Sequence, residues 1–231
     1  TRGRQAPRHI RLRRFKPRPG DRALRRPAGF HTTSILLPQP NAQYVRRNLL
    51  AAHAAGAKLV ARRSVSSIGV TVAAMVATST LLRRPRPYII PAGGSSSVGV
   101  LGYVNAAFEL ADQIDAGAVP QPQRIYLSLG SMGTTAGLAI GLALAGIPAE
   151  IQAVRVVETR FGSMEKLSTL VDNTLRRLRG MNVSIPDIDA MKHITIRQEF
   201  FGRQYGEFTQ SGVEAVDAAR EAADVRLDGT Y

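Results

Sequence analysis

The sequence contains no cysteine and only four histidines. Without cysteine there can be no disulfide framework, no thiolate metal site and no cysteine nucleophile. The histidines are too scattered to form a ligand motif such as HExxH, so we expect no histidine-based metal site. The longest apolar run, residues 136–147, is shorter than the roughly 20 residues that a membrane-spanning helix needs. We therefore expect a protein with no metal and no membrane span, and we take the cytoplasm as its default location.

Acidic residues are scarce, with 17 Asp and Glu against 31 Lys and Arg. The resulting net charge of +14 suggests a nucleic-acid partner at first sight. Residues 1–30, however, hold 11 of the basic residues and only one acidic residue, which leaves 20 basic and 16 acidic residues over 31–231. The body of the chain is thus nearly balanced, which argues against nucleic-acid binding by that part.

Residues 1–30 are rich in Arg and Pro and show no apolar periodicity. Four prolines interrupt any helix in this segment. We predict that it is disordered. Three explanations stay open: a basic arm that contacts phosphates, a transit peptide, and a segment joined wrongly to the rest of the chain. The basic arm is the only feature that supports nucleic-acid binding, and we rank that function last.

From residue 31 onward the sequence changes into regular strand and helix patterns. Strands are predicted at 33–37 and 58–61, and helices at 41–55, with Asn41 as the N-cap, and at 66–83. The second helix has apolar or small residues at burial spacing, namely Ile68, Val72, Met75, Val76 and Ser79. We interpret the Arg/Pro run that follows this helix, residues 83–87, as a connector between two domains. We therefore predict a partial small α/β domain at 31–87 and a large one at 88–231.

The larger domain continues the alternation of strands and helices. Strands are predicted at 125–129, 150–157 and 193–196. Helices are predicted at 98–117, from about 136 to 146, from Ser163 to a C-cap at Gly180, and from Thr209 or Ser211 onward. This pattern is typical of an α/β fold with a mostly parallel sheet and helices on both faces. Ligands of such sheets bind beyond the carboxyl ends of the strands.

The strand at 125–129 leads into a Gly-rich turn, Gly130-Ser131-Met132-Gly133-Thr134. Glycine allows a positive φ angle and close backbone approach, which we expect at Gly130 and Gly133. Backbone N–H groups at the start of the next helix would then converge on an anion. The turn therefore predicts a phosphate cradle. An ordinary strand-to-helix turn with a Thr N-cap stays equally open, because neither common phosphate motif is present.

Three groups of motifs carry a resemblance to a known family. They are residues 36–40 with 44–50, Gly93-Gly94-Ser95-Ser96 with 101–104, and 130–139. Their order and spacing resemble the family of D-cysteine desulfhydrase and 1-aminocyclopropane-1-carboxylate (ACC) deaminase. Its members are pyridoxal-phosphate enzymes of fold type II, which is similar to tryptophan synthase β. The resemblance covers the chain from about residue 31 to its end.

The resemblance implies pyridoxal 5'-phosphate as the cofactor, with its phosphate on Gly130, Ser131, Met132, Gly133 and Thr134. It places Ser95 and Ser96 in a loop near the cofactor, in a form closer to the desulfhydrases. Tyr205 and Tyr231 match two family tyrosines that line the pyridoxal site and contact the substrate. The implied reaction is β-elimination from a small amino acid such as D-cysteine, giving pyruvate, ammonia and sulfide. The implied assembly is a homodimer.

The chain departs from the family pattern at both ends. The Schiff-base lysine of the family lies in a Gly-Asn-Lys context and is followed by a Ser-Asn-His segment, and neither is present. Lys58, Lys166 and Lys192 fall in elements whose family counterparts are not catalytic. The closing strand and helix after Tyr231 are also missing. We therefore expect a fragment of the fold, incomplete at both ends and inactive alone, or else a non-catalytic subunit that keeps the phosphate cradle.

Overall fold

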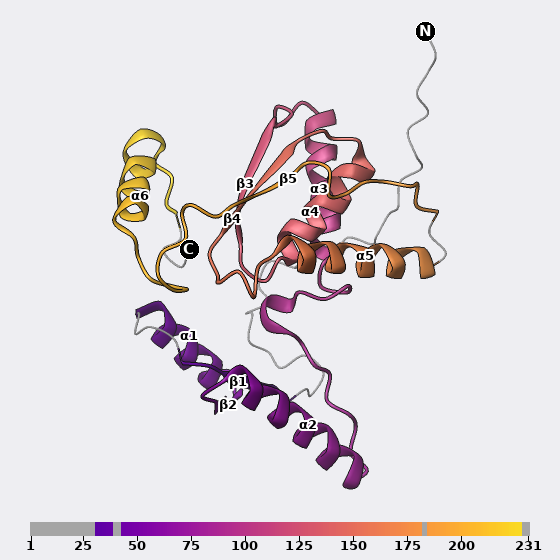
Figure 1. Ribbon diagram of the computed structural model, residues 1–231, viewed down its shortest axis with the longest axis vertical. Helices are drawn as coiled ribbons and strands as arrows, with labels where there is room; N and C mark the ends of the chain where they lie inside the picture. Colours follow the sequence, from indigo (N-terminus) through magenta and orange to yellow (C-terminus); the bar gives the residue numbers. More distant parts are fainter. Residues whose placement is uncertain (1–30, 39–42, 182–183, 228–231) are drawn as a thin grey trace. The chain divides into compact units, whose positions relative to one another are not determined.

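The computed structural model describes residues 31–38, 43–181 and 184–227. The chain divides into two units, with the boundary between Pro87 and Tyr88 (Figure 1). The segment 1–30, for which we predicted disorder, lies outside the described residues, as does the predicted N-cap Asn41. No helix of the described residues is long and apolar enough to cross a membrane.

The described residues of the first unit form two parallel strands and two helices. Strand β1 (Thr33–Leu36) pairs with β2 (Lys58–Ala61) in register from the first residue of each. Helix α1 (Gln43–Ala54) connects the strands, and α2 (Val65–Leu81) follows them. Ser64 caps α2 by accepting a hydrogen bond from the Ser67 N–H, while the Ser67 side chain bonds the Ser64 backbone. The helix bounds lie within two residues of the predicted ones.

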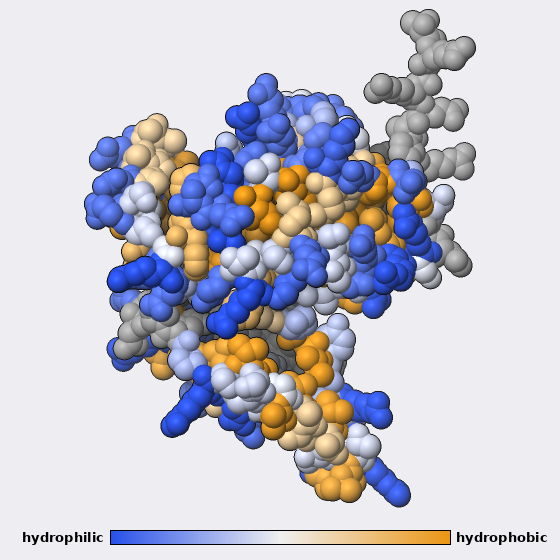
Figure 2. Space-filling model, viewed as in Figure 1, coloured by the Kyte–Doolittle hydropathy of each residue, from blue (hydrophilic) through white to orange (hydrophobic). Residues whose placement is uncertain are grey.

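Helix α2 is largely apolar and carries no charged residue, yet none of its residues is buried. The stripe predicted from its spacing, Ile68 to Ser79, is half-buried, while Val70 and Leu81 are 71% and 82% exposed. Figure 2 shows hydrophobic residues at the surface of the first unit. Helices of this composition normally lie inside a core. The periodicity therefore identified the correct face, but the described residues do not bury it.

The second unit is a three-stranded parallel sheet with helices. Its elements are the 3-10 turn η2 (Ala92–Gly94), α3 (Leu101–Asp115), β3 (Arg124–Leu129), α4 (Gly133–Ala145), β4 (Glu150–Arg155), α5 (Met164–Gly180), β5 (Ile194–Arg197) and α6 (Gln210–Ala223). The strands lie in the order β3-β4-β5, and both pairings are parallel. The predicted α/β class with a parallel sheet is confirmed.

Helix α4 forms the centre of the core. It is made mostly of Ala, Gly and Leu, and eight of its residues are buried. Helix α3 packs against it at two glycines one turn apart: a Cβ on Gly137 would lie 2.4 Å from Tyr103 Cβ, and one on Gly141 would lie 2.5 Å from Ala107 Cβ. The two helices approach this closely only because both positions lack side chains. Since α3 follows the Gly93 turn and α4 follows the Gly130 turn, this packing positions both turns.

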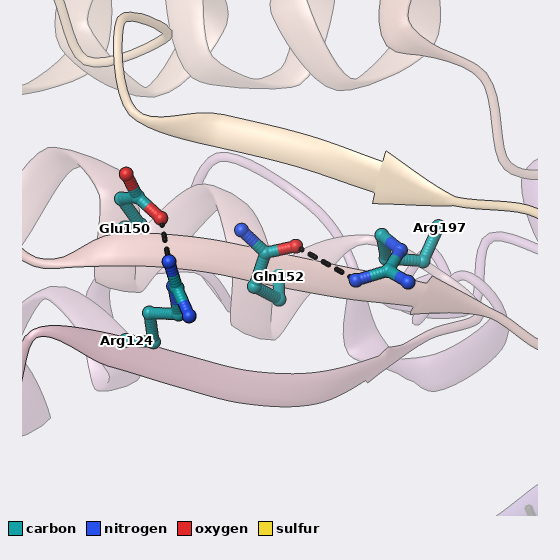
Figure 3. Close-up of polar contacts among 4 residues, drawn as sticks. All are labelled: Arg124, Glu150, Gln152 and Arg197. Carbon is teal, nitrogen blue, oxygen red and sulfur yellow. Dashed lines mark hydrogen bonds and ion pairs between the residues drawn. The ribbon is translucent and has the colours of Figure 1, made fainter.

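The sheet has one apolar face and one polar face. Leu129, Ile151 and Ala153 belong to the buried core on the face that α4 contacts. The opposite face carries Tyr126, which is 63% exposed. Figure 3 shows the polar contacts on the strands: Arg124 pairs with Glu150 at 3.1 Å, and Arg197 Nη1 donates to Gln152 Oε1 at 3.5 Å.

Two of the predicted helix caps are confirmed, and one is wrong. Ser163 accepts a hydrogen bond from the Lys166 N–H at the start of α5, and Thr209 accepts one from the Gly212 N–H at the start of α6. Gly180 is not the C-cap of α5, because the helix includes it and Met181 takes that position. The φ angle of Gly180 is not positive, so this turn does not use the freedom of glycine.

Candidate active site

Two Gly/Ser turns that lie 36 residues apart in sequence meet at the start of α4. The Ser95 hydroxyl donates to Ser131 Oγ at 2.8 Å. A Cβ on Gly93 would lie 2.1 Å from Ser131 Oγ, and one on Gly133 would lie 2.6 Å from Ser95 Oγ. Glycine at both positions thus lets the turns approach each other. The structure therefore brings together two loops that the sequence analysis predicted separately.

The backbone of the Gly130 turn differs from the prediction. The positive φ angle, 68°, belongs to Met132, whereas neither Gly130 nor Gly133 has one. Glycine is needed at 133 for space rather than for its φ angle, because Ser95 occupies the place of a side chain. A positive φ at Met132 is strained for a residue with a Cβ. Backbone strain of this kind is common at ligand-binding turns.

No threonine caps α4, so the predicted Thr N-cap is wrong, while the choice between an ordinary turn and a cradle stays a prediction. The N-cap is Met132, which makes no side-chain capping bond. The first bond of the helix runs from the Ala136 N–H to the Met132 carbonyl. The N–H groups from Met132 to Thr135 therefore have no partner within the helix. They lie at the positive end of the helix dipole, where an anion is stabilised.

A buried hydroxyl adds to this helix terminus. Thr135 is fully buried, and its Oγ1 finds no hydrogen-bond partner among the described residues. A buried polar atom of this kind normally has a partner. The neighbouring Thr134 is half-buried and Ser131 is exposed. The turn thus offers backbone donors and hydroxyls at one helix terminus, a combination that suits an oxyanion.

The three serines of the second turn, residues 95–97, make different contacts. Ser95 contacts the Gly130 turn, as described above, whereas Ser96 Oγ accepts the Gly99 N–H at 3.2 Å within its own turn. Ser97 Oγ accepts from Arg177 Nε at 3.0 Å and so ties the turn to α5. Of the two predicted serines, Ser95 contacts the Gly130 turn, and Ser96 bonds within its own turn.

Of the two predicted tyrosines, the structure describes Tyr205. Tyr205 is half-buried in the segment that follows β5. Because the strands are parallel, this segment leaves the sheet at the same edge as the Gly130 turn. Tyr231 lies outside the described residues. The grouping of these tyrosines with the cradle stays a prediction.

Arg155 was not singled out from the sequence but lies at the same edge, at the end of β4. Two groups at the ends of the strands have a shifted pKa: Arg124 starts β3 at the opposite edge, and Glu199 follows β5 at the same edge as Arg155. A hydrogen bond from Arg197 lowers the pKa of Glu199, and one to Glu150 raises the pKa of Arg124. The described residues hold no group of three or more His, Asp or Glu side chains that could bind a metal.

Known proteins resemble this chain over most of its length, although no protein-family model matches it. It is 36% identical over 207 residues to nocardicin C-9' epimerase of Nocardia uniformis subsp. tsuyamanensis. It is 34% identical over 146 residues to D-cysteine desulfhydrase of Klebsiella pneumoniae, and 33% over 149 residues to that of Serratia proteamaculans. In sequence the chain is therefore similar to this epimerase and to the D-cysteine desulfhydrases. The matched regions cover 88%, 63% and 63% of the chain respectively.

A solved structure shares the fold of this chain. An ACC deaminase homologue superposes with a TM-score of 0.64 at 22% identity, over 88% of the chain. The chain spans 58% of that structure, 61% of the epimerase and 42% of each desulfhydrase. The α/β fold is therefore that of the family, whereas the activity of the whole protein is a matter for proposal.

Proposed function

We propose that this chain carries the phosphate-binding part of a pyridoxal-phosphate-dependent lyase or deaminase that acts on small amino acids. The observation that supports it most is the junction of the Gly93 and Gly130 turns. There, a glycine at 133 leaves room beside Ser95, and the backbone donors of α4 stand without partners in the helix. The Thr135 hydroxyl in the first turn of α4 is buried without a partner among the described residues, and a polar atom of this kind normally has one.

In this proposal each part of the turn has a separate task. The N–H groups of residues 132–135 and the hydroxyls of Ser131 and Thr134 bind the phosphate. Ser95 orients Ser131 through the 2.8 Å hydrogen bond. Tyr205 and Tyr231 hold or move a proton at their phenol oxygens. Pyridoxal phosphate, when bound, supplies an electron sink for the bond changes at the amino acid.

The reaction that the family suggests is that of D-cysteine desulfhydrase, β-elimination giving pyruvate, ammonia and sulfide. A lysine that would bind the cofactor covalently has no Gly-Asn-Lys counterpart in this sequence. We therefore propose that the chain alone binds the cofactor without turning over D-cysteine. The same observation favours a second candidate, a non-catalytic subunit that keeps the cradle.

Two measurements test this function. Calorimetry should show that the wild-type chain binds pyridoxal phosphate more tightly than pyridoxal, and that Gly133→Asp abolishes this preference through repulsion of the phosphate. Gly102→Asp is the matched control: Gly102 also lies in the first turn of a helix, and a Cβ there meets nothing within 4 Å. Equal binding by Gly133→Asp and wild type would refute the site. Formation of pyruvate from D-cysteine by the pure chain would refute its inactivity.

A further inference from the structure

Strand β4 places a charged residue where its pattern calls for an apolar one. Alternate residues of a strand share a face. Ile151 and Ala153 are 2% and 0% exposed on the core face, and Arg155, the next residue on that face, is only 9% exposed. Arg155 thus carries its guanidinium into a largely enclosed position at the carboxyl end of the strand.

The described contacts of Arg155 leave its charge without a counter-ion. Its Nη1 donates to Thr159 Oγ1 at 2.7 Å, and its Cζ lies 5.9 Å from the centre of the Phe201 ring. Its Nε is buried and has no partner among the residues that the structure describes, and none of their carboxylates forms an ion pair with it. A buried cation without a counter-ion is costly.

Two other arginines on the sheet show the usual arrangement. Arg124 pairs with Glu150, and Arg197 pairs with Glu199 (Figure 3 shows the first pair). Both lie in more exposed positions, where a counter-ion matters less. The arginine that most needs an anion is thus the one for which the described residues supply none.

Arg155 lies beside the cradle. The strand register pairs it with Leu129, the residue that precedes Gly130. A Cβ on Gly162 would lie 3.7 Å from both Arg155 Cγ and the Gly130 carbonyl oxygen, so the stem of the arginine and the first residue of the turn flank the same position. The N-terminus of α4 adds partial positive charge at this edge. Two features that attract anions are therefore neighbours.

We propose that Arg155 binds an oxyanion at the carboxyl edge of the sheet, as a counter-cation next to the cradle. This rests on the proposed function, which puts two oxyanions at this edge: the phosphate of the cofactor and the carboxylate of the amino acid. A guanidinium binds either through its planar N–H donors. None of the described carboxylates pairs with this guanidinium, and Thr159 holds one arm of its fork in place.

Calorimetric titration of Arg155→Gln tests the proposal, with Arg124→Gln as the matched control at the opposite end of the sheet. The probes are pyridoxal phosphate, pyridoxal, and D-alanine added to the chain loaded with pyridoxal phosphate. We expect Arg155→Gln to weaken one of these by about tenfold or more, because a charge-assisted hydrogen bond is lost. The control should bind all three as wild type does.

The pattern of loss identifies the anion. Weaker binding of pyridoxal phosphate with unchanged pyridoxal assigns Arg155 to the phosphate. Unchanged pyridoxal phosphate with weaker D-alanine assigns it to the carboxylate. If Arg155→Gln binds all three as wild type does while Gly133→Asp fails to bind pyridoxal phosphate, the role of Arg155 is refuted and the cradle stands. If the wild-type chain binds none of them, both proposals fail.

Thermal unfolding gives a second readout that does not depend on a bound amino acid. Arg155→Met removes the unpaired charge and keeps much of the apolar stem. Without ligand we expect its Tm to equal or exceed that of wild type. Inorganic phosphate should raise the Tm of the wild-type chain and raise that of the variant less. A variant that is less stable than wild type and gains as much from phosphate would show that Arg155 has a structural role only.

Discussion

The close packing of α3 on α4 predicts that a single methyl group at Gly141 will disturb the site from a distance. In Gly141→Ala the new Cβ would lie 2.5 Å from Ala107 Cβ, 2.7 Å from the Val104 carbonyl oxygen and 3.2 Å from Val104 Cα. These are backbone atoms or a Cβ fixed to the backbone, so no side-chain rotation relieves the contact. The two helices must move apart.

The expected cost follows from two opposing effects. Alanine gains about 1 kcal/mol over glycine in a helix interior. Overpacking in a well-packed core costs about 1–3 kcal/mol, and the contact with rigid backbone points to the upper part of this range or beyond it. We therefore expect a net loss of about 1–2 kcal/mol in the free energy of unfolding, which lowers Tm by about 2–8 °C for a domain of this size.

Differential scanning calorimetry of Gly141→Ala and Gly102→Ala provides the test. Gly102 lies in α3 and has an ordinary φ angle, and a Cβ there meets nothing within 4 Å. The same substitution should therefore stabilise the chain at 102, by up to about 1 kcal/mol, and destabilise it at 141. Binding of pyridoxal phosphate should weaken only in Gly141→Ala, since the Ser95–Ser131 contact depends on the helix spacing. Equal stability changes at the two positions would refute the close packing.

Three smaller predictions concern single contacts. Ser163→Ala should lower the free energy of unfolding by about 1 kcal/mol in urea titration, because the Lys166 N–H loses its capping acceptor; no change would contradict the observed cap. By NMR titration the pKa of Glu199, which the Arg197 hydrogen bond lowers, should rise in Arg197→Gln. The stabilising effect of this pair should be present above the unfolded pKa of about 4.3 and be lost as the pH falls through the lower folded pKa. Gly93→Ala should weaken phosphate binding, since its Cβ would displace the Ser131 hydroxyl.

The elements of the fold could be predicted from local signals. The β2 bounds are as predicted, and Ser163 and Thr209 cap the helices they were expected to cap. These signals depend on a few neighbouring residues, so a single sequence is enough to detect them. Gly180 was placed wrongly because a glycine near the end of a helix pattern fits both the last turn and the cap.

The candidate site was predictable in part. The sequence pointed to the Gly130 turn and to Ser95 because Gly and Ser cluster before helices there. It did not predict that Met132 would take the positive φ angle, since the choice depends on what surrounds Gly133. Nor did it predict the contact between Ser95 and Ser131, which joins residues far apart in the chain. The φ angle of Met132 and the contact between Ser95 and Ser131 both depend on packing between elements. Local sequence patterns do not predict such packing.

The sequence could have pointed to Arg155, because this residue breaks the apolar pattern expected on the buried face of a strand. The period of two in β4 puts Ile151 and Ala153 on one face, and the third position of that face falls on an arginine. A charge at such a position is either at a strand end in solvent or buried for a purpose, and only the structure separates these cases. Its 9% exposure rules out solvent, and none of the described carboxylates forms an ion pair with it. The proposed ligand anion accounts for both observations.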